Sequence, residues 1–241
     1  MTTSATPNRI LAIGAHPDDL EFGCGGLLLK EVQAGSELSI VVGSRGESGS
    51  IGNAELREAE TRAAAAMLNA SDRLQFLDLG GDGTQQQSPQ NALKIARLIR
   101  QLQPQQVLAP SPDANQHPDH RVVSQLTRDA CRLARYGGLE PLKDLPVHKV
   151  TSLWFYAVTS PYETNAEKPV LIDVSAQFEA WQQLMSCHKS QVQSKAYLDL
   201  QNSRARQLGL LAGVEYAIAV WPNDPLVLEN LSSLSKTARG Y

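Results

Sequence analysis

The sequence has few cysteines, few aromatic residues and no apolar run long enough to span a membrane. Its three cysteines, Cys24, Cys131 and Cys187, form no C-x-x-C pair, and their odd number argues against a disulfide framework. A net charge of −3, without a basic stripe interleaved with aromatic residues, gives no sign of nucleic-acid binding. The first six residues are polar and unlike a signal peptide. These absences predict a cytoplasmic protein with no nucleic-acid or membrane partner.

The 241 residues, 42% of them hydrophobic, are enough to build a well-buried core. Short apolar runs predict strands at residues 9–15, 38–42, 75–79, 106–109, 150–158 and 169–174. Helices are predicted at residues 26–33, 53–70, 88–102, 119–136, 176–188 and 193–209, with a solvated loop at 85–88 and no clear pattern after 213. This alternation predicts an α/β, Rossmann-like domain over residues 1–241, with a mostly parallel central sheet and helices on both faces.

Two polar clusters each follow a predicted strand, at residues 14–21 and 117–120. Because ligands bind outside the carboxyl ends of strands in an open α/β sheet, we expect the clusters to share one site. A catalytic zinc site uses three nitrogen or oxygen ligands and keeps a position open for water. His16, Asp19 and one histidine of the second cluster complete such a set. Asp18 and the other histidine are then left for proton transfer and oxyanion stabilisation.

Each cluster alone also has an ordinary structural explanation. His-Pro-Asp-Asp is compatible with a solvated turn whose aspartate caps a helix, and most His-x-x-His pairs are surface or core residues. The chain has only five histidines, however, and three of them fall in the two acid-containing clusters. We therefore favour a shared site over coincidence.

Several segments of the chain follow a recognisable order. They are Ala-His-Pro-Asp-Asp at 15–19, Arg-Gly-Glu-x-Gly at 45–49, Arg-Glu-Ala-Glu at 57–60, His-Pro-Asp-His at 117–120 and Ser-Cys-His-Lys-Ser-Gln at 186–191. In order and interval they resemble the zinc-dependent N-acetylglucosaminyl deacetylases of the PIG-L/LmbE family. The resemblance implies a Zn²⁺-dependent N-deacetylase that releases acetate from a small-molecule N-acetylglucosaminyl substrate, with zinc-bound water as the nucleophile.

The resemblance also implies roles for individual residues. His16, Asp19 and His120 would bind Zn²⁺, and Asp18 would be the general base. His117 would polarise the amide oxygen or act as a general acid. Beside it, Asp119 would tune an imidazole as an outer carboxylate.

Four further residues are candidates for substrate binding by the same resemblance. Arg57 matches a position that holds the sugar or its substituent, although an ion pair with Glu60 on the same helix explains it equally well. Glu47 and Asp82 are weaker candidates for contacts near the sugar hydroxyls. His188 would line the pocket, or it would be a helix-terminal histidine that bonds a backbone carbonyl.

The C-terminal part is most similar to the N-acetylglucosaminyl-malate deacetylases of bacillithiol biosynthesis. The likeness lies in residues 188–191, 204–209, 213–216 and 224–226. Those proteins usually carry a glutamate two residues after the tyrosine of the third segment, where this chain has Ile218, and Glu215 either compensates or is unrelated. Relatives are often oligomeric, so the resemblance is compatible with a homo-oligomer.

Other functional classes fit less well. The Gly-Cys-Gly-Gly run at 23–26 fails the dinucleotide pattern G-x-G-x-x-G, and residues 46–50 fail the G-x-S-x-G pattern of serine hydrolases. The remaining alternatives are a deacetylase of another N-acetyl sugar or glycoconjugate, a metal-dependent phosphoesterase and a non-catalytic metal-binding protein. A histidine-carboxylate site also accepts iron or cobalt.

Overall fold

A single seven-stranded sheet organises the chain in the computed structural model, which describes residues 7–159, 168–193, 196–234 and 236–238. Its strands are β1 (Arg9–Gly14), β2 (Glu37–Val42), β3 (Leu74–Phe76), β4 (Gln106–Pro110), β5 (Ser152–Tyr156), β6 (Val170–Asp173) and β7 (Ala217–Pro222). The strand order is β3-β2-β1-β4-β5-β7-β6. Strands β1 to β5 are parallel, and only β7 runs against its neighbours β5 and β6. The predicted mostly parallel α/β fold is confirmed.

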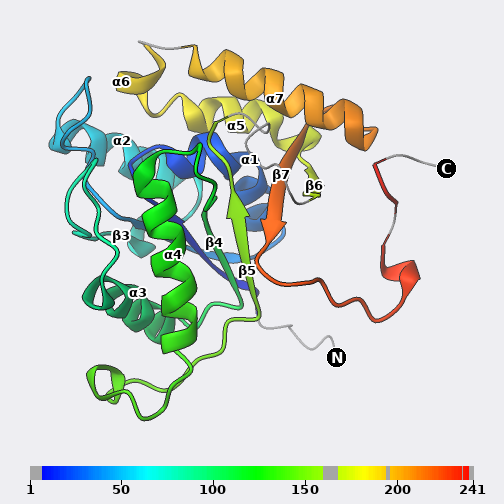
Figure 1. Ribbon diagram of the computed structural model, residues 1–241. Helices are drawn as coiled ribbons and strands as arrows, with labels where there is room; N and C mark the ends of the chain where they lie inside the picture. The colour runs from blue at the N-terminus through cyan, green and yellow to red at the C-terminus, as the bar shows by residue number, and fades with distance from the viewer. Residues whose placement is uncertain (1–6, 160–167, 194–195, 235, 239–241) are drawn as a thin grey trace.

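Helices cover both faces of this sheet (Figure 1). They are α1 (Asp19–Gln33), α2 (Ala54–Met67), α3 (Pro89–Leu102), α4 (Pro118–Leu133), α5 (Phe178–Met185), α6 (Lys189–Val192) and α7 (Tyr197–Ala212). Short 3-10 turns occupy Ser71–Arg73, Glu140–Leu142, Ser175–Gln177 and Leu231–Ser233. Alternate residues of each strand point to opposite faces. Ile10 and Ala12 join a core with α1, α2 and α5, whereas Leu11 and Ile13 join one with α3 and α4.

The helix after the first strand begins seven residues earlier than predicted. It starts at Asp19 rather than at residue 26, so the glycine run at 23–26 lies inside α1 and not in a loop. A Cβ on Gly23 would lie 2.4 Å from the Tyr156 ring, and one on Gly25 would lie 2.9 Å from the Trp181 ring. The glycines are there because α1 packs too closely on its neighbours to carry side chains at these positions.

Other predicted elements differ at their ends. Asn53 and Ser88 cap α2 and α3 through their side chains, as their sequence positions suggest. The tail after residue 213 contains β7, an inner strand of the sheet.

Two parts of the sequence predictions, the polar residues 1–6 and residues 194–195 of the helix predicted at 193–209, lie outside the described residues. Among the described residues, no helix combines the length and apolar character needed to cross a membrane.

The topology brings the two polar clusters together. Strand β1 pairs with β2 on one side and with β4 on the other, so the chain order reverses at β1. In such sheets a crevice opens at the carboxyl ends of the two strands that flank the reversal. The cluster at 16–19 follows β1, and the cluster at 117–120 follows β4 and opens α4. The fold therefore predicts one shared site there.

We expect Gly25→Ala to lower the free energy of unfolding by about 1–3 kcal/mol, because an added methyl overpacks a well-filled core. The new Cβ would lie 2.9 Å from both Trp181 and Leu184, which are almost fully buried. Urea unfolding measures the effect. In the control Gly138→Ala the added Cβ meets nothing within 4 Å. Equal stability of both variants would contradict tight packing of α1 on α5.

Candidate active site

The turn between β1 and α1 is fixed by the Asp19 carboxylate. Its Oδ2 accepts hydrogen bonds from the backbone N–H groups of Ala15 at 2.8 Å and His16 at 2.9 Å. Asp18 precedes it at the N-cap of α1 with φ 108°, a left-handed conformation that is costly for a residue other than glycine. The Asp18 side chain makes no capping hydrogen bond. One aspartate thus organises the turn, and the other keeps its carboxylate for a different contact.

Three side chains meet at this turn in a set suited to a metal ion. Asp19 Oδ1 lies 3.0 Å from His120 Nε2, and Asp19 Oδ2 lies 3.5 Å from His16 Nδ1. One ligand atom from each of these residues falls within 4.8 Å of the others. The ring nitrogen Nδ1 of His120 is buried and has no hydrogen-bond partner among the described residues. Two imidazoles and a carboxylate whose ligand atoms converge in this way, with Nε2 of His120 facing Asp19, fit a transition-metal ion such as zinc.

The charges at this turn also favour a cation. Burial lowers the pKa of His16, but Asp19 and Asp119 outweigh it and raise the value to about 10. Burial raises the pKa of Asp19, whereas His120 and His16 bring it well below its usual range. Carboxylates therefore exceed the fixed positive charges here, and the cluster stabilises positive charge on or near its imidazoles.

The Asp18 carboxyl group lies in a different environment. Its side chain is 14% exposed, and Arg57 Nη2 donates to its Oδ2 at 3.1 Å. Burial and the neighbouring Asp19 raise the pKa of Asp18 to about 7, while Arg57 opposes that shift. A carboxyl group with a pKa near neutrality can both accept and release a proton at physiological pH.

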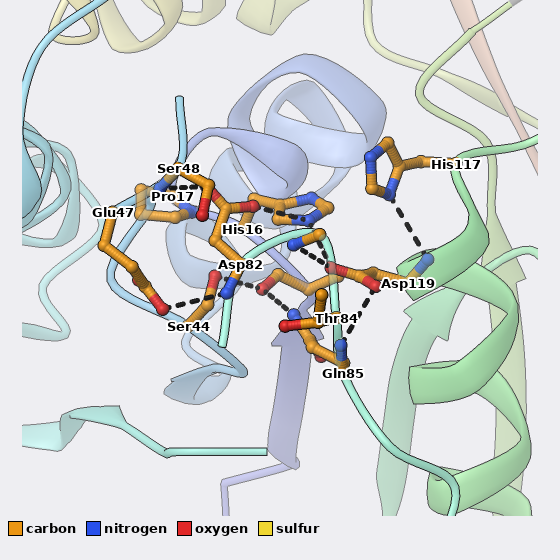
Figure 2. A network of polar contacts seen from close by, with 12 residues as sticks. His16, Pro17, Ser44, Glu47, Ser48, Asp82, Thr84, Gln85, His117 and Asp119 are labelled. Carbon is orange, nitrogen blue, oxygen red and sulfur yellow. Dashed lines mark hydrogen bonds and ion pairs between the residues drawn. The ribbon is translucent and has the colours of Figure 1, made fainter. Parts of the chain in front are cut away.

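A second metal-ligand set overlaps the first at His16. It combines His16 with His117 and Asp119. Asp119 Oδ2 lies 3.0 Å from His16 Nε2, and the same carboxylate accepts the backbone N–H groups of Gly83 and Gln85 (Figure 2). Three contacts hold this carboxylate in place, which suits an outer partner that orients the His16 ring. The resemblance implies that Asp119, beside His117, tunes an imidazole, and the imidazole that its side chain contacts in the structure is that of His16.

His117 stands at the rim, at the N-cap of α4. Its Nδ1 accepts the backbone N–H of Asp119 at 3.2 Å (Figure 2). Burial and the histidines His16 and His120 lower the pKa of His117 below its ordinary value. A neutral ring whose Nδ1 accepts a hydrogen bond carries its proton on Nε2. His117 therefore presents an N–H donor beside His16, whose ring centroid is 4.6 Å away.

Of the four substrate-binding candidates, Asp82 contacts the metal-ligand set directly. Its Oδ1 is 3.2 Å from His16 Nε2, and its Oδ2 accepts the Ser48 backbone N–H. In the opposite direction, the Glu47 carboxylate accepts a hydrogen bond from the Asp82 backbone N–H at 2.8 Å. Figure 2 shows these bonds, which join the glycine-rich loop at 43–52 to the turn at 80–84. The carboxylates of Glu47 and Asp82 thus hold two loops against each other.

Arg57 and His188 are both buried. Arg57 pairs with Asp18 and not with Glu60, whose carboxylate accepts the N–H and the hydroxyl of Ser190. His188 is completely buried, precedes the short helix α6 and lies 3.3 Å from Glu21 Oε2. It therefore lies beneath the site surface, and it does not end a helix.

Sequence reasoning missed other residues that support the site. Gln85 was predicted in a solvated loop, yet it is buried, and its side chain donates to the Ala15 carbonyl at 2.7 Å. Ser44 donates to the same carbonyl. A glutamine run carries no local signal for such a contact, because the contact depends on a neighbouring strand end that is 70 residues away.

The chain is similar to several known proteins. The family model described as "PIG-L: GlcNAc-PI de-N-acetylase" matches residues 11–131. A 1D-myo-inositol 2-acetamido-2-deoxy-alpha-D-glucopyranoside deacetylase from Nakamurella multipartita is 29% identical over 67% of this chain and 67% of its own length. The crystal structure of the conserved protein TT1542 from Thermus thermophilus is 30% identical, with a TM-score of 0.79 over 92% of this chain and 97% of that one. A 4-oxalmesaconate hydratase from Pseudomonas putida is 23% identical over 94% of both chains.

If His120 belongs to the ligand set, we expect His120→Ala to weaken Zn²⁺ binding by more than the roughly 10–100-fold typical of losing an outer partner. Isothermal titration of metal-free protein with Zn²⁺ measures the affinity. His148→Ala is the matched control, since His148 Nε2 contacts the Pro104 carbonyl and lies outside both candidate sets. Unchanged affinity in His120→Ala would rule out the His16–Asp19–His120 centre.

Proposed function

Because the chain belongs to the PIG-L family, we propose that it is a metal-dependent hydrolase that removes the acetyl group from an N-acetylglucosamine-containing small molecule. The observation that carries the proposal is that three chemical functions converge at the carboxyl ends of β1 and β4. His16, Asp19 and His120 form a metal-ligand set, Asp18 offers a carboxylate, and His117 offers an N–H donor. Amide hydrolysis needs these functions together.

His16, Asp19 and His120 would hold the metal, and zinc is the ion we propose for this set of donors. A divalent ion in such a site polarises a carbonyl oxygen and lowers the pKa of water. Asp119 and Asp82 keep the His16 ring in place through contacts of 3.0 and 3.2 Å to its Nε2. Neighbouring carboxylates thus orient the His16 ring within the ligand set.

Asp18 is the proposed general base. Its carboxylate takes the proton of the water that attacks the acetyl carbonyl carbon. His117, with its proton on Nε2, donates a hydrogen bond to the carbonyl oxygen as that atom gains negative charge. The C–N bond then breaks, acetate leaves, and the amine nitrogen takes the proton that Asp18 accepted from water, which returns Asp18 to its carboxylate form.

We propose N-acetylglucosaminyl-malate as the substrate, on the strength of the C-terminal resemblance to bacillithiol-pathway enzymes. The environment of Ile218 accounts for the apolar residue at the position where those relatives usually carry a glutamate. Ile218 is 3% exposed in β7, and its side chain packs against α1 at Gly26. A glutamate could not occupy this apolar contact without losing its hydration. Glu215 is exposed, so its side chain does not replace the missing carboxylate in that buried position.

We expect the purified protein to release acetate from N-acetylglucosaminyl-malate, and a metal chelator to abolish the release. Parallel assays with the 1D-myo-inositol glycoside, diacetylchitobiose and free N-acetylglucosamine rank the possible aglycones. Acetate is measured by an enzyme-coupled assay. Chelator-resistant release, or no release from any of the four compounds, would contradict the proposed function.

Asp18→Asn is expected to lower kcat by about 10²–10⁴-fold, the usual contribution of a general base. Zn²⁺ affinity should stay close to that of the wild type, because Asp18 is not in the ligand set. The exposed Asp72 provides the matched control, and Asp72→Asn should leave both quantities unchanged. Normal turnover by Asp18→Asn would assign the base to another residue.

A second candidate function is hydration of a carbon–carbon double bond, because the alignment with 4-oxalmesaconate hydratase covers 94% of both chains. The same base and N–H donor could add water to a conjugated acid. Incubation with 4-oxalmesaconate distinguishes the two functions, since hydration shortens the conjugated system and lowers its ultraviolet absorbance. Loss of absorbance, with no acetate from the N-acetyl sugars, would favour the hydratase.

A further inference from the structure

The Arg57 side chain is enclosed by the glycine-rich loop that follows β2. Only 4% of the residue is exposed. A Cβ on Gly46 would lie 3.2 Å from Arg57 Cζ, one on Gly49 would lie 2.8 Å from Nη1, and one on Gly52 would lie 3.5 Å from Cδ. Three glycines therefore let the loop backbone close over the whole length of the side chain.

The guanidinium group contacts the first polar cluster at two points. Arg57 Nη2 donates to the Pro17 carbonyl oxygen and, at 3.1 Å, to Asp18 Oδ2. These acceptors lie on either side of the backbone N–H of Asp18, the residue with φ 108°. Arg57 Nη2 thus fixes both the carbonyl group that precedes Asp18 and the side-chain carboxylate of Asp18.

The helix that carries Arg57 is itself fixed. Asn53 Oδ1 accepts the Leu56 N–H at 2.9 Å and caps the start of α2. One turn after Arg57, Glu60 accepts the Ser190 N–H at 2.8 Å and the Ser190 hydroxyl at 2.7 Å. Contacts before and after Arg57 therefore set the position from which it reaches Asp18.

We propose that Arg57 is a positioning residue, which holds the Asp18 carboxylate in its reactive place while the loop at 46–52 clamps the guanidinium group. The inference rests on the proposed function, in which Asp18 accepts a proton from water. Asp18 makes no capping hydrogen bond of its own, so Arg57 is its fixed partner on the Oδ2 side. Among the residues that the structure describes, none forms a hydrogen bond with the other oxygen, Oδ1, which is left for the reaction.

Gly49→Ala tests the clamp without altering any polar group. Gly49 is not among the positive-φ residues, so alanine fits its backbone, but the new Cβ would displace Arg57 Nη1. We expect kcat to fall at least about tenfold, because small misplacements of a reacting group are costly. KM should stay within about twofold, since loss of an interaction that acts in the transition state lowers kcat and kcat/KM equally. Gly138→Ala, with an open neighbourhood, should match the wild type.

Arg57→Lys provides a second variant that keeps the charge but loses the planar fork. It should also lose kcat with little change in KM, and both variants should keep wild-type Zn²⁺ affinity. A raised KM with an unchanged kcat would instead assign Arg57 to the sugar and overturn the proposal.

Crystal structures of Gly49→Ala and Arg57→Lys supply a readout that does not depend on activity. We expect the Asp18 carboxylate to move away from its wild-type position, with or without relaxation of φ from 108°. If the wild-type protein releases no acetate, the proposed function fails, and the structures still show whether Arg57 positions Asp18. An Asp18 that keeps its place and conformation in both variants would overturn the inference.

Discussion

The Asp19 carboxylate is the contact on which the rest of the site depends. One oxygen accepts the backbone N–H groups of Ala15 and His16, and the other lies 3.0 Å from His120 Nε2. The same group therefore shapes the turn after β1, starts α1 and joins the first cluster to the second across 101 residues of sequence. A second link between the two clusters, His16 Nε2 to Asp119 Oδ2 at 3.0 Å, starts from the His16 residue whose backbone N–H Asp19 already holds.

The fold class and the meeting of the two clusters could be predicted from sequence, because both follow from short-range signals. Apolar runs mark the strands, and the polar residues directly after two of them must lie at the same edge of a parallel sheet. The start of α1 was predicted seven residues too late, because the glycines at 23–26 disfavour a helix locally, whereas their cause is the Tyr156 and Trp181 side chains that pack against α1. Those neighbours come from parts of the chain that no local pattern connects with the run.

The contacts of Arg57 show why site geometry is harder to predict than site composition. From sequence, Glu60 is the natural partner of Arg57, because residues three apart on a helix are neighbours. In the fold, Glu60 turns to Ser190 and Arg57 turns to Asp18. Local spacing fixes which groups can meet, but the packing of α2 against the loop at 43–52 and against α6 decides which of them do.

Asp18 is held in a conformation that costs of order 1–3 kcal/mol for a residue other than glycine. A glycine would remove that strain but would bring no carboxylate, and an aspartate that capped α1 would use its oxygens on backbone N–H groups. In this turn the two roles fall to different residues. Asp19 satisfies the backbone, and Arg57 holds Asp18 from outside the turn. The strain at Asp18 is thus the structural consequence of keeping one carboxylate oxygen uncommitted beside a metal-ligand set.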